Sequence, residues 1–298
     1  MSTQHTVDAS ASNAVAAPTQ FVGTTQGRYA YRRLGKAGGC PLLFLQHFTG
    51  TLDNWDPALV DRVAASHDVI LFDNAGIGGS SGTVPNTIAG MTAHVFAFLD
   101  ALGISTCNVL GFSLGGMIAQ QMALDRPSMQ RRTILVGTAP RGGEDVMHLE
   151  KPSIAKYTQD PQYRGYGVLQ KIFFPPSESA QAAGAAFIAR LSQRTSDLDP
   201  ACGPSVAQAQ MAAFREWDHF EGERFGDLQR IKQPTLVMNG VKDEMIAVRN
   251  SYFLAENLPN AVLLTYPDAG HGSLFQYHEP FARQVAAFLA SESPSAPY

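Results

Sequence analysis

The sequence predicts an α/β protein with a mostly parallel, doubly wound sheet and an inserted helical cap. Continuous apolar runs, such as PLLFLQ at 41–46, are typical of strands that are covered on both faces. Stretches with apolar residues at helical spacing lie between these runs. This alternation favours a parallel sheet with helices on both of its faces. Between residues 141 and 230 the sequence offers helix-like segments without a buried strand, which predicts a cap.

Each element has its own local signal. Two pieces that alternate polar and apolar residues predict a hairpin around Gly27. Pro57 is typical of a helix start, and the segment from Thr87 repeats apolar residues at helical spacing. In chain order we expect strands near 20–24, 28–34 and 41–46, a helix at Pro57, a strand at 68–73, a helix from Thr87, a strand at 107–112, a helix at 115–126 and a strand at 132–139, then strands at 235–240 and 261–267 with helices near 248–257 and 278–290.

The same pattern divides the chain into a core, a cap and two tails. We assign the α/β core to residues 20–140 and 231–290. The cap takes residues 141–230, because the strand and helix rhythm breaks there. Small and polar side chains dominate residues 1–19 and 291–298, so we expect both segments to be flexible tails.

Composition excludes several classes of partner. With 298 residues, 45% of them hydrophobic and 16% charged, the chain can bury one large core. A formal net charge of -4, without long runs of lysine or arginine, argues against nucleic acid or an anionic membrane as partner. No segment reaches the roughly 18 apolar residues of a membrane span, and the N-terminus lacks the apolar run of a signal peptide.

The three cysteines indicate neither disulfides nor zinc. Cys40, Cys107 and Cys202 are odd in number and widely spaced, and they form no CxxC or Cys/His ligand pattern. A reducing compartment is therefore expected, and we predict a cytoplasmic protein. The expected partner is a small-molecule substrate, with no metal and no cofactor.

Two stretches match Gly-x-Ser-x-Gly, and their contexts differ. GFSLG surrounds Ser113, which lies between a short apolar run and a helix-like stretch that ends at Pro127. GGSSG surrounds Ser80, which lies in a glycine-rich segment that continues into loop-like residues. A nucleophilic serine at a sharp turn from strand to helix needs small neighbours on both sides. We therefore predict that Ser113 is the nucleophile.

A serine nucleophile needs a histidine base and an acid that orients this base. Ligands and catalytic groups gather at the carboxyl ends of the strands in α/β sheets. His271 follows the expected strand at 261–267, and Asp243 follows the strand at 235–240. The order Ser113, Asp243, His271 is the order used by enzymes with this elbow. Asp145, beyond the strand at 132–139, is a second candidate for the acid.

Acyl transfer also needs hydrogen-bond donors for the developing oxyanion. One expected donor is the backbone N–H of Leu114, the residue after the nucleophile. The other should come from the loop after the strand at 41–46, where we choose Phe48.

The cap contributes large aromatic side chains. Packed over the serine, they would form a closed apolar pocket of roughly 300 to 1,000 Å³, which suits a small molecule. We expect at least one of them to contact substrate, and we choose Trp217 for its reach and its polar N–H. The set comprises Phe173, Phe174, Phe187, Phe214 and Trp217.

Together these motifs resemble the α/β-hydrolase superfamily, near its haloperoxidase-like esterases and enol-lactonases. The resemblance covers about residues 25 to 290 and rests on HFTGTLDNW, DNAGIGGSS, GFSLGG, NGVKD and DAGHG. It implies the same triad and oxyanion amides, and it explains GGSSG as part of a structural turn. One departure matters, because Gln46 and His47 stand where many members have His-Gly. We place the His47 ring in the substrate pocket.

The expected activity is that of a serine hydrolase without metal or cofactor. It would cleave a small carboxylic ester or lactone through an acyl-enzyme on Ser113, which water then releases. The same machinery also serves amide and carbon–carbon bond hydrolysis. Two further functions fit the same residues, namely perhydrolysis by hydrogen peroxide and ligand binding by a receptor that retains the triad.

Overall fold

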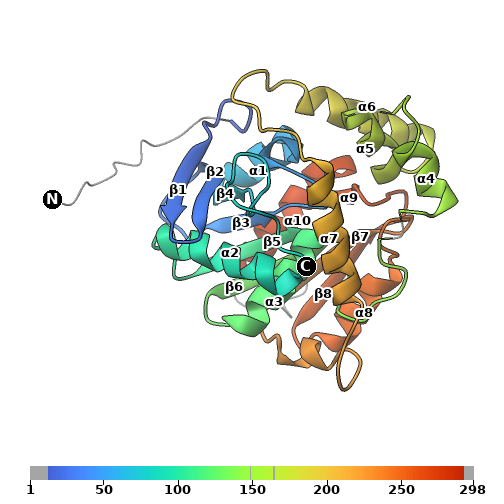
Figure 1. Ribbon diagram of the computed structural model, residues 1–298. Coiled ribbons are helices and arrows are strands. Elements are labelled where there is room, and N and C mark those ends of the chain that lie inside the picture. Colours follow the sequence, from blue (N-terminus) through green and yellow to red (C-terminus); the bar gives the residue numbers. More distant parts are fainter. Residues whose placement is uncertain (1–12, 148, 164, 292–298) are drawn as a thin grey trace.

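The computed structural model describes residues 13–147, 149–163 and 165–291, and it contains an eight-stranded sheet (Figure 1). The order across the sheet is β1-β2-β4-β3-β5-β6-β7-β8. β2 pairs antiparallel with β1 and with β4, and all the other pairs are parallel. The predicted mostly parallel α/β sheet is therefore confirmed. The strands are β1 Gln20–Thr24, β2 Gly27–Gly35, β3 Leu42–Leu45, β4 Asp68–Phe72, β5 Cys107–Phe112, β6 Gln130–Val136, β7 Thr235–Gly240 and β8 Ala261–Tyr266.

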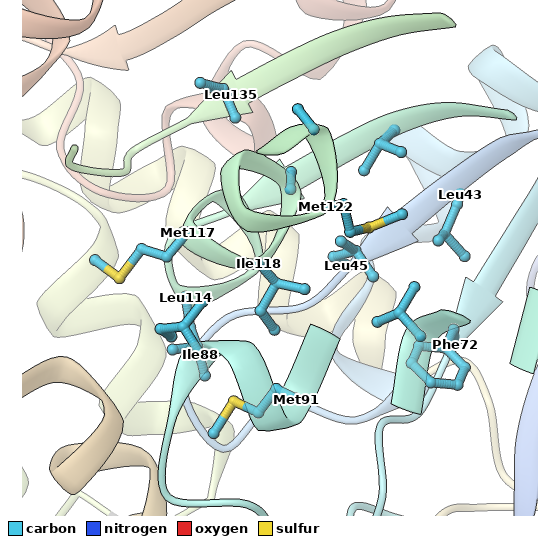
Figure 2. Packing of buried hydrophobic residues seen from close by; sticks show 14 of the residues in the cluster. Leu43, Leu45, Phe72, Ile88, Met91, Leu114, Met117, Ile118, Met122 and Leu135 are labelled. Atoms are coloured by element: carbon cyan, nitrogen blue, oxygen red, sulfur yellow. The ribbon is translucent and has the colours of Figure 1, made fainter. Parts of the chain in front are cut away.

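Helices cover both faces of the sheet. Side chains alternate along a strand, so that Leu43 and Leu45 of β3 pack with α2 and α3, whereas Leu42 and Phe44 pack with α1 and α10. Figure 2 shows the first of these two cores, in which Met91 of α2 and Ile118 of α3 lie close to Leu45. The helices of this domain are α1 Pro57–Ala64, α2 Ile88–Ala101, α3 Leu114–Asp125, α8 Arg249–Asn257, α9 Ser273–Gln276 and α10 His278–Ala290, with short 3-10 helices η1 Leu52–Asn54 and η2 Gly226–Arg230.

In the described part of the chain, four α-helices lie between β6 and β7. They are α4 Pro152–Thr158, α5 Tyr166–Phe173, α6 Glu178–Leu191 and α7 Pro204–Trp217. In Figure 1, α4, α5 and α6 lie together, and α7 brings the chain back over the sheet, where it contacts α2. Charged pairs fasten the insertion to the core. Arg190 of α6 makes two hydrogen bonds, of 2.7 and 2.6 Å, with the buried carboxylate of Asp56 at the start of α1.

Residues 13–19 differ from the expected flexible tail. Ala17 is fully buried, and the N–H of Ala14 donates to Asp61. Arg194, which follows α6, donates to the carbonyl oxygens of Val15 and Ala17. Small side chains allow this segment to fit closely between α1 and the end of α6. The remainder of the two expected tails lies outside the described residues.

No helix in the described part of the chain has the length and the hydropathy that a membrane span requires.

Candidate active site

Ser113 lies at the sharp turn between β5 and α3. Its backbone has φ 57° and ψ −118°, a conformation that costs energy in a residue with a side chain. Glycine neighbours make the turn possible. A Cβ on Gly111 would lie 2.4 Å from the carbonyl oxygen of Gly115, and one on Gly115 would lie 2.1 Å from that of Leu45. The Ser113 hydroxyl is buried and has no hydrogen-bond partner within the described residues.

His271 and Asp243 are hydrogen-bonded at the same edge of the sheet. Nδ1 of His271 lies 2.8 Å from Oδ2 of Asp243, and both side chains are buried. The other oxygen of Asp243 accepts the backbone N–H groups of Met245 and Ile246 at 2.8 and 3.0 Å. A carboxylate held in this way can only accept, so Nδ1 of His271 carries the proton and Nε2 is free to accept one.

A glycine brings the two loops together. A Cβ on Gly240, at the end of β7, would lie 2.3 Å from the carbonyl oxygens of both Ala269 and Gly270. Only glycine therefore allows the loop that carries Asp243 to approach the loop that carries His271.

The histidine lies beside the serine turn. Its ring lies 4.9 Å, centroid to centroid, from the ring of Phe112, the residue before Ser113. A Cβ on Gly137, at the end of β6, would lie 3.2 Å from Nδ1 of His271. Because β5, β6, β7 and β8 are neighbours in the sheet, the loops after β5, β7 and β8 bring Ser113, Asp243 and His271 to the same edge. The structure thus unites the three predicted residues, and their catalytic roles remain predictions.

The loop after β3 is held from both sides. Oε1 of Gln46 accepts the N–H of His47 at 2.9 Å, and Nε2 of Gln46 donates to the carbonyl oxygen of Thr51. Thr49 has a positive φ of 55°, and its N–H donates to Oε1 of Gln210 on α7 at 2.7 Å. Phe48 lies within this loop. Leu114 is the first residue of α3, where backbone N–H groups lack an intrahelical acceptor. That the backbone N–H groups of Phe48 and Leu114 act as oxyanion donors stays a prediction.

His47 is neutral and buried between aromatic rings. Its ring packs edge-on against Phe112 and Phe173, with centroid distances of 5.4 and 5.2 Å. Burial lowers the pKa of His47 from its ordinary value of 6.5 to about 3, and the nearby His271 lowers it as well. The ring therefore remains uncharged at neutral pH, close to His271.

Three of the predicted cap aromatics, Phe173, Phe214 and Trp217, differ in the groups that they contact. Phe173 lies against the site, with its ring 5.4 Å from that of His271, and Phe214 lies 6.1 Å from Phe48. Trp217, by contrast, donates its indole N–H to the carbonyl oxygen of Ala139 at 3.1 Å and is 1% exposed. This hydrogen bond occupies the polar group that we expected to face the substrate. A substrate contact for Trp217 stays a prediction.

A large pocket opens beside the acid and the histidine loop. It has a volume of about 640 Å³ between α4, α5 and the loops after β7 and β8, and Asp243 and Gly270 are part of its wall. Ser113 and His271 are each 1% exposed. Neither side chain is part of the wall of this pocket.

The rival residues have other contacts. The Ser80 hydroxyl donates to the carbonyl oxygen of Asp73 at 2.7 Å and accepts the N–H of Ala30 at 2.8 Å. Asp145 pairs with Lys151, and its side chain is half exposed. Ser80 thus ties β2 to the turn after β4, and Asp243 rather than Asp145 contacts the histidine. Among the described residues, no group of three or more His, Cys, Asp or Glu side chains could hold a metal ion.

The sequence did not predict Gln210 as a residue near the site, and it predicted Phe173 only as one of five aromatic residues of the cap. Gln210 lies on the buried face of α7, among small and apolar residues. A lone glutamine on such a face is the signal that could have indicated a buried hydrogen-bond partner, although it does not reveal the identity of that partner.

A doubly wound sheet in this strand order, with a serine at the turn after β5 and a hydrogen-bonded Asp–His pair after β7 and β8, defines a hydrolase class of α/β proteins. The chain belongs to the alpha/beta hydrolase fold family, whose model matches residues 41–276.

Three similar proteins illustrate the range within this family. The chain is 27% identical to a putative carbamate hydrolase RutD of Caulobacter sp. (strain K31), over 91% of this chain and 98% of that protein. It is 26% identical to a putative non-heme bromoperoxidase BpoC of Mycobacterium tuberculosis, over 85% and 95% of the two chains. An alpha/beta hydrolase fold protein from Chitinophaga pinensis has a solved structure with a TM-score of 0.87 and 42% identity, over 94% and 99%.

Proposed function

We propose that the protein is a serine hydrolase that cleaves a small carboxylic ester or lactone through an acyl-enzyme on Ser113. The observation that carries this proposal is the buried His271–Asp243 hydrogen bond of 2.8 Å beside the strained turn of Ser113. Strained backbone and a buried, fully hydrogen-bonded carboxylate are costly to maintain, and they are typical of catalytic sites.

Each residue then has a defined task. Nε2 of His271 takes the proton from the Ser113 hydroxyl as its oxygen attacks the substrate carbonyl. The N–H groups of Phe48 and Leu114 donate to the oxyanion that develops. The protonated histidine then gives its proton to the leaving alcohol. Water, deprotonated by the same Nε2, attacks the acyl-enzyme; the bond between the acyl carbon and Oγ of Ser113 then breaks, the histidine returns its proton to Oγ, and the acid is released. Asp243 holds the tautomer of His271 and stabilises the imidazolium in both steps.

The relatives widen the set of bonds that an assay should include. One is named a putative carbamate hydrolase and another a putative non-heme bromoperoxidase. A carbamate carbonyl can be attacked by the same serine, and hydrogen peroxide can replace water as the acceptor of the acyl group. Assays with carbamates, and peracid formation from acetate and hydrogen peroxide, therefore belong beside those with esters, lactones and amides.

The test combines labelling with turnover. A fluorophosphonate probe should label wild-type protein at Ser113, as located by peptide mass spectrometry, and a panel of small esters and lactones should be hydrolysed. Ser113→Ala should lose both properties. Ser192→Ala is the matched control, because Ser192 is exposed at the far end of α6 and its hydroxyl donates to the carbonyl oxygen of Ile188. Labelling at another serine, or ester turnover by Ser113→Ala, would refute the proposal.

A further inference from the structure

A small cavity lies behind the loop that carries Phe48. It has a volume of about 30 Å³, enough for one or two non-hydrogen atoms of the size of a water molecule. Its apolar wall includes Leu114, Ile118 and Met91, which Figure 2 shows facing one another between α2 and α3. Its polar wall includes His47 and Gln210. Because Leu114 borders the cavity and follows Ser113, the cavity lies beside the proposed nucleophile.

His47 brings a hydrogen-bond acceptor to this wall. Its Nδ1 lies 2.8 Å from the carbonyl oxygen of Phe48. A carbonyl oxygen can only accept, so Nδ1 carries the proton and Nε2 bears the free lone pair. Nε2 is buried without a partner among the described residues. An unpaired buried acceptor is unfavourable, and a donor that reaches it recovers this lost free energy.

Gln210 brings a hydrogen-bond donor. Its Oε1 accepts the N–H of Thr49 at 2.7 Å, and this contact fixes the orientation of the amide, because a backbone N–H requires an acceptor. The amide nitrogen of Gln210 therefore faces away from Thr49, and its two N–H groups can donate to a group in the cavity.

The other polar side chains of the wall are already paired. Gln46 uses its oxygen for the N–H of His47 and its nitrogen for Thr51. Asn74 uses its oxygen for the N–H of Ala75 and its nitrogen for the carbonyl oxygen of Met91. The wall therefore offers one oriented acceptor, on His47, and one oriented donor, on Gln210.

We propose that His47 and Gln210 form a subsite for a hydroxyl group on the acyl part of a short hydroxy ester or hydroxy lactone. A hydroxyl group is the small group that both donates, here to Nε2 of His47, and accepts, here from the amide of Gln210. An ether oxygen satisfies only Gln210, and a methylene satisfies neither. The cavity volume limits the acyl group to a short chain. The inference rests on the proposed function, because it places the ester carbonyl at Ser113.

Three matched esters separate the two contacts. Ethyl lactate carries the hydroxyl, its methyl ether keeps the oxygen but loses the donor, and ethyl propionate lacks both. We expect wild-type kcat/KM for ethyl lactate to exceed that for ethyl propionate by about tenfold, the ratio expected of one to two net hydrogen bonds. The ratio of lactate to its methyl ether reports on the His47 contact, and the ratio of ether to propionate reports on Gln210.

Variants then assign each ratio to its residue. His47→Phe keeps a planar ring without the acceptor, and it should reduce the lactate-to-ether ratio about threefold, the share of one of the two contacts, whereas His47→Gln should restore part of it. Gln210→Glu keeps the acceptor for Thr49 and should lose the ether-to-propionate preference. His94→Phe is the matched control, because His94 hydrogen-bonds Tyr29 of β2 and does not line the cavity, and its ratios should equal those of the wild type. The variants are compared by ratios, so a general loss of rate does not affect the result.

Three outcomes would count against the subsite. Equal wild-type rates with the three esters, or ratios that His47→Phe and Gln210→Glu leave unchanged, would overturn it. Fluorophosphonate labelling of Ser113 in each variant shows that the site is folded. If no ester or lactone is hydrolysed by the wild type at all, the proposed function fails and the subsite fails with it, whereas turnover without a hydroxyl preference overturns the subsite alone.

Discussion

A hydrogen bond links α7 to the loop after β3, in which the N–H of Thr49 donates to Oε1 of Gln210 at 2.7 Å. The two residues are 161 positions apart in the sequence. Thr49 has a positive φ, which a threonine adopts only when its surroundings require it. We therefore expect Gln210 to position Phe48, the neighbour of Thr49, so that the placement of α7 is coupled to the predicted oxyanion donor.

This coupling predicts a rate defect in Gln210→Met. The variant removes the acceptor of Thr49 but keeps the length of the side chain. Because full loss of one oxyanion donor costs about a hundredfold in kcat or more, a displaced donor should cost about tenfold, with little change in KM. Steady-state kinetics with an unsubstituted ester measure both parameters. Gln208→Met, at an exposed position of the same helix, should behave as wild type. An equal rise in KM with constant kcat would speak against a positioning role.

Ser113→Ala and Ser80→Ala should separate catalysis from structure. Without its nucleophile, Ser113→Ala should show no measurable turnover and remain folded. Ser80→Ala should retain the reaction but lose stability, by about 1–3 kcal/mol, because the buried N–H of Ala30 loses its acceptor. Chemical denaturation and ester kinetics on both proteins test this. Covalent labelling found at Ser80 would contradict the assignment.

Asp243→Asn should lower kcat by about three to four orders of magnitude while the fold is retained. The amide cannot hold the tautomer of His271 or stabilise its protonated form. Asp145→Asn is the control, because the structure places its half-exposed side chain on Lys151. Near-normal turnover in Asp243→Asn, with a large loss in Asp145→Asn, would transfer the acid to the strand before the cap.

The neutral state of His47 predicts a pH-dependent contribution to stability. Its pKa is about 3 in the folded protein, below the ordinary 6.5 expected after unfolding. Between these values the unfolded chain binds a proton that the folded protein does not, so this contribution decreases as the pH falls through that window. The free energy of unfolding should therefore decrease more steeply with acidification in wild type than in His47→Phe, by up to about 1.4 kcal/mol per pH unit.

Two measurements can check this. Urea denaturation of both proteins at several pH values below 6.5 gives the difference in slope directly. Nitrogen NMR of the imidazole should show a neutral ring protonated at Nδ1 throughout the neutral range. A His47 ring that titrates near pH 6.5 would contradict the burial found in the structure.

The sequence predicted the parts of this molecule that local chemistry determines. Buried strands leave continuous apolar runs such as Leu42–Leu45, and the serine turn requires glycine at 111 and 115, so both can be recognised from the residues themselves. The choice of Asp243 and His271 as candidates follows from the rule that catalytic groups lie at strand ends. What could not be predicted depends on how distant segments pack. The partner of Trp217 is a carbonyl oxygen 78 positions away, which no local pattern indicates.

Contacts with distant segments also determine the structure of residues 13–19 and of the loop after β3, so the sequence did not predict them. Residues 13–19 are small and polar enough to resemble a flexible tail, and the position of Arg194, after α6, gives the carbonyl oxygens of Val15 and Ala17 a donor. Gln210 likewise contacts Thr49 because α7 crosses the loop after β3. Cap-to-core contacts of this kind depend on the placement of whole helices, which the hydrophobic pattern leaves open.

The last prediction concerns the acyl chain length that the closed site accepts. Phe173 packs against the rings of His271 and Phe112, and Phe112 is the residue before Ser113. With Phe173 in place, p-nitrophenyl esters should be hydrolysed best when the acyl group is short, and kcat/KM should fall steadily as the chain lengthens. Phe173→Ala should move the optimum to a longer acyl group, because the deleted ring leaves space beside the catalytic histidine.

Trp217→Phe serves as the comparison in this series. The substitution keeps most of the ring volume and removes the hydrogen bond to Ala139, so we expect a lower melting temperature with an unchanged chain-length profile. A shift of the optimum in Trp217→Phe would instead support the substrate contact that the sequence predicts for this residue. A wild-type optimum at long chains, or a profile that Phe173→Ala leaves unaltered, would show that the acyl group does not lie beneath Phe173.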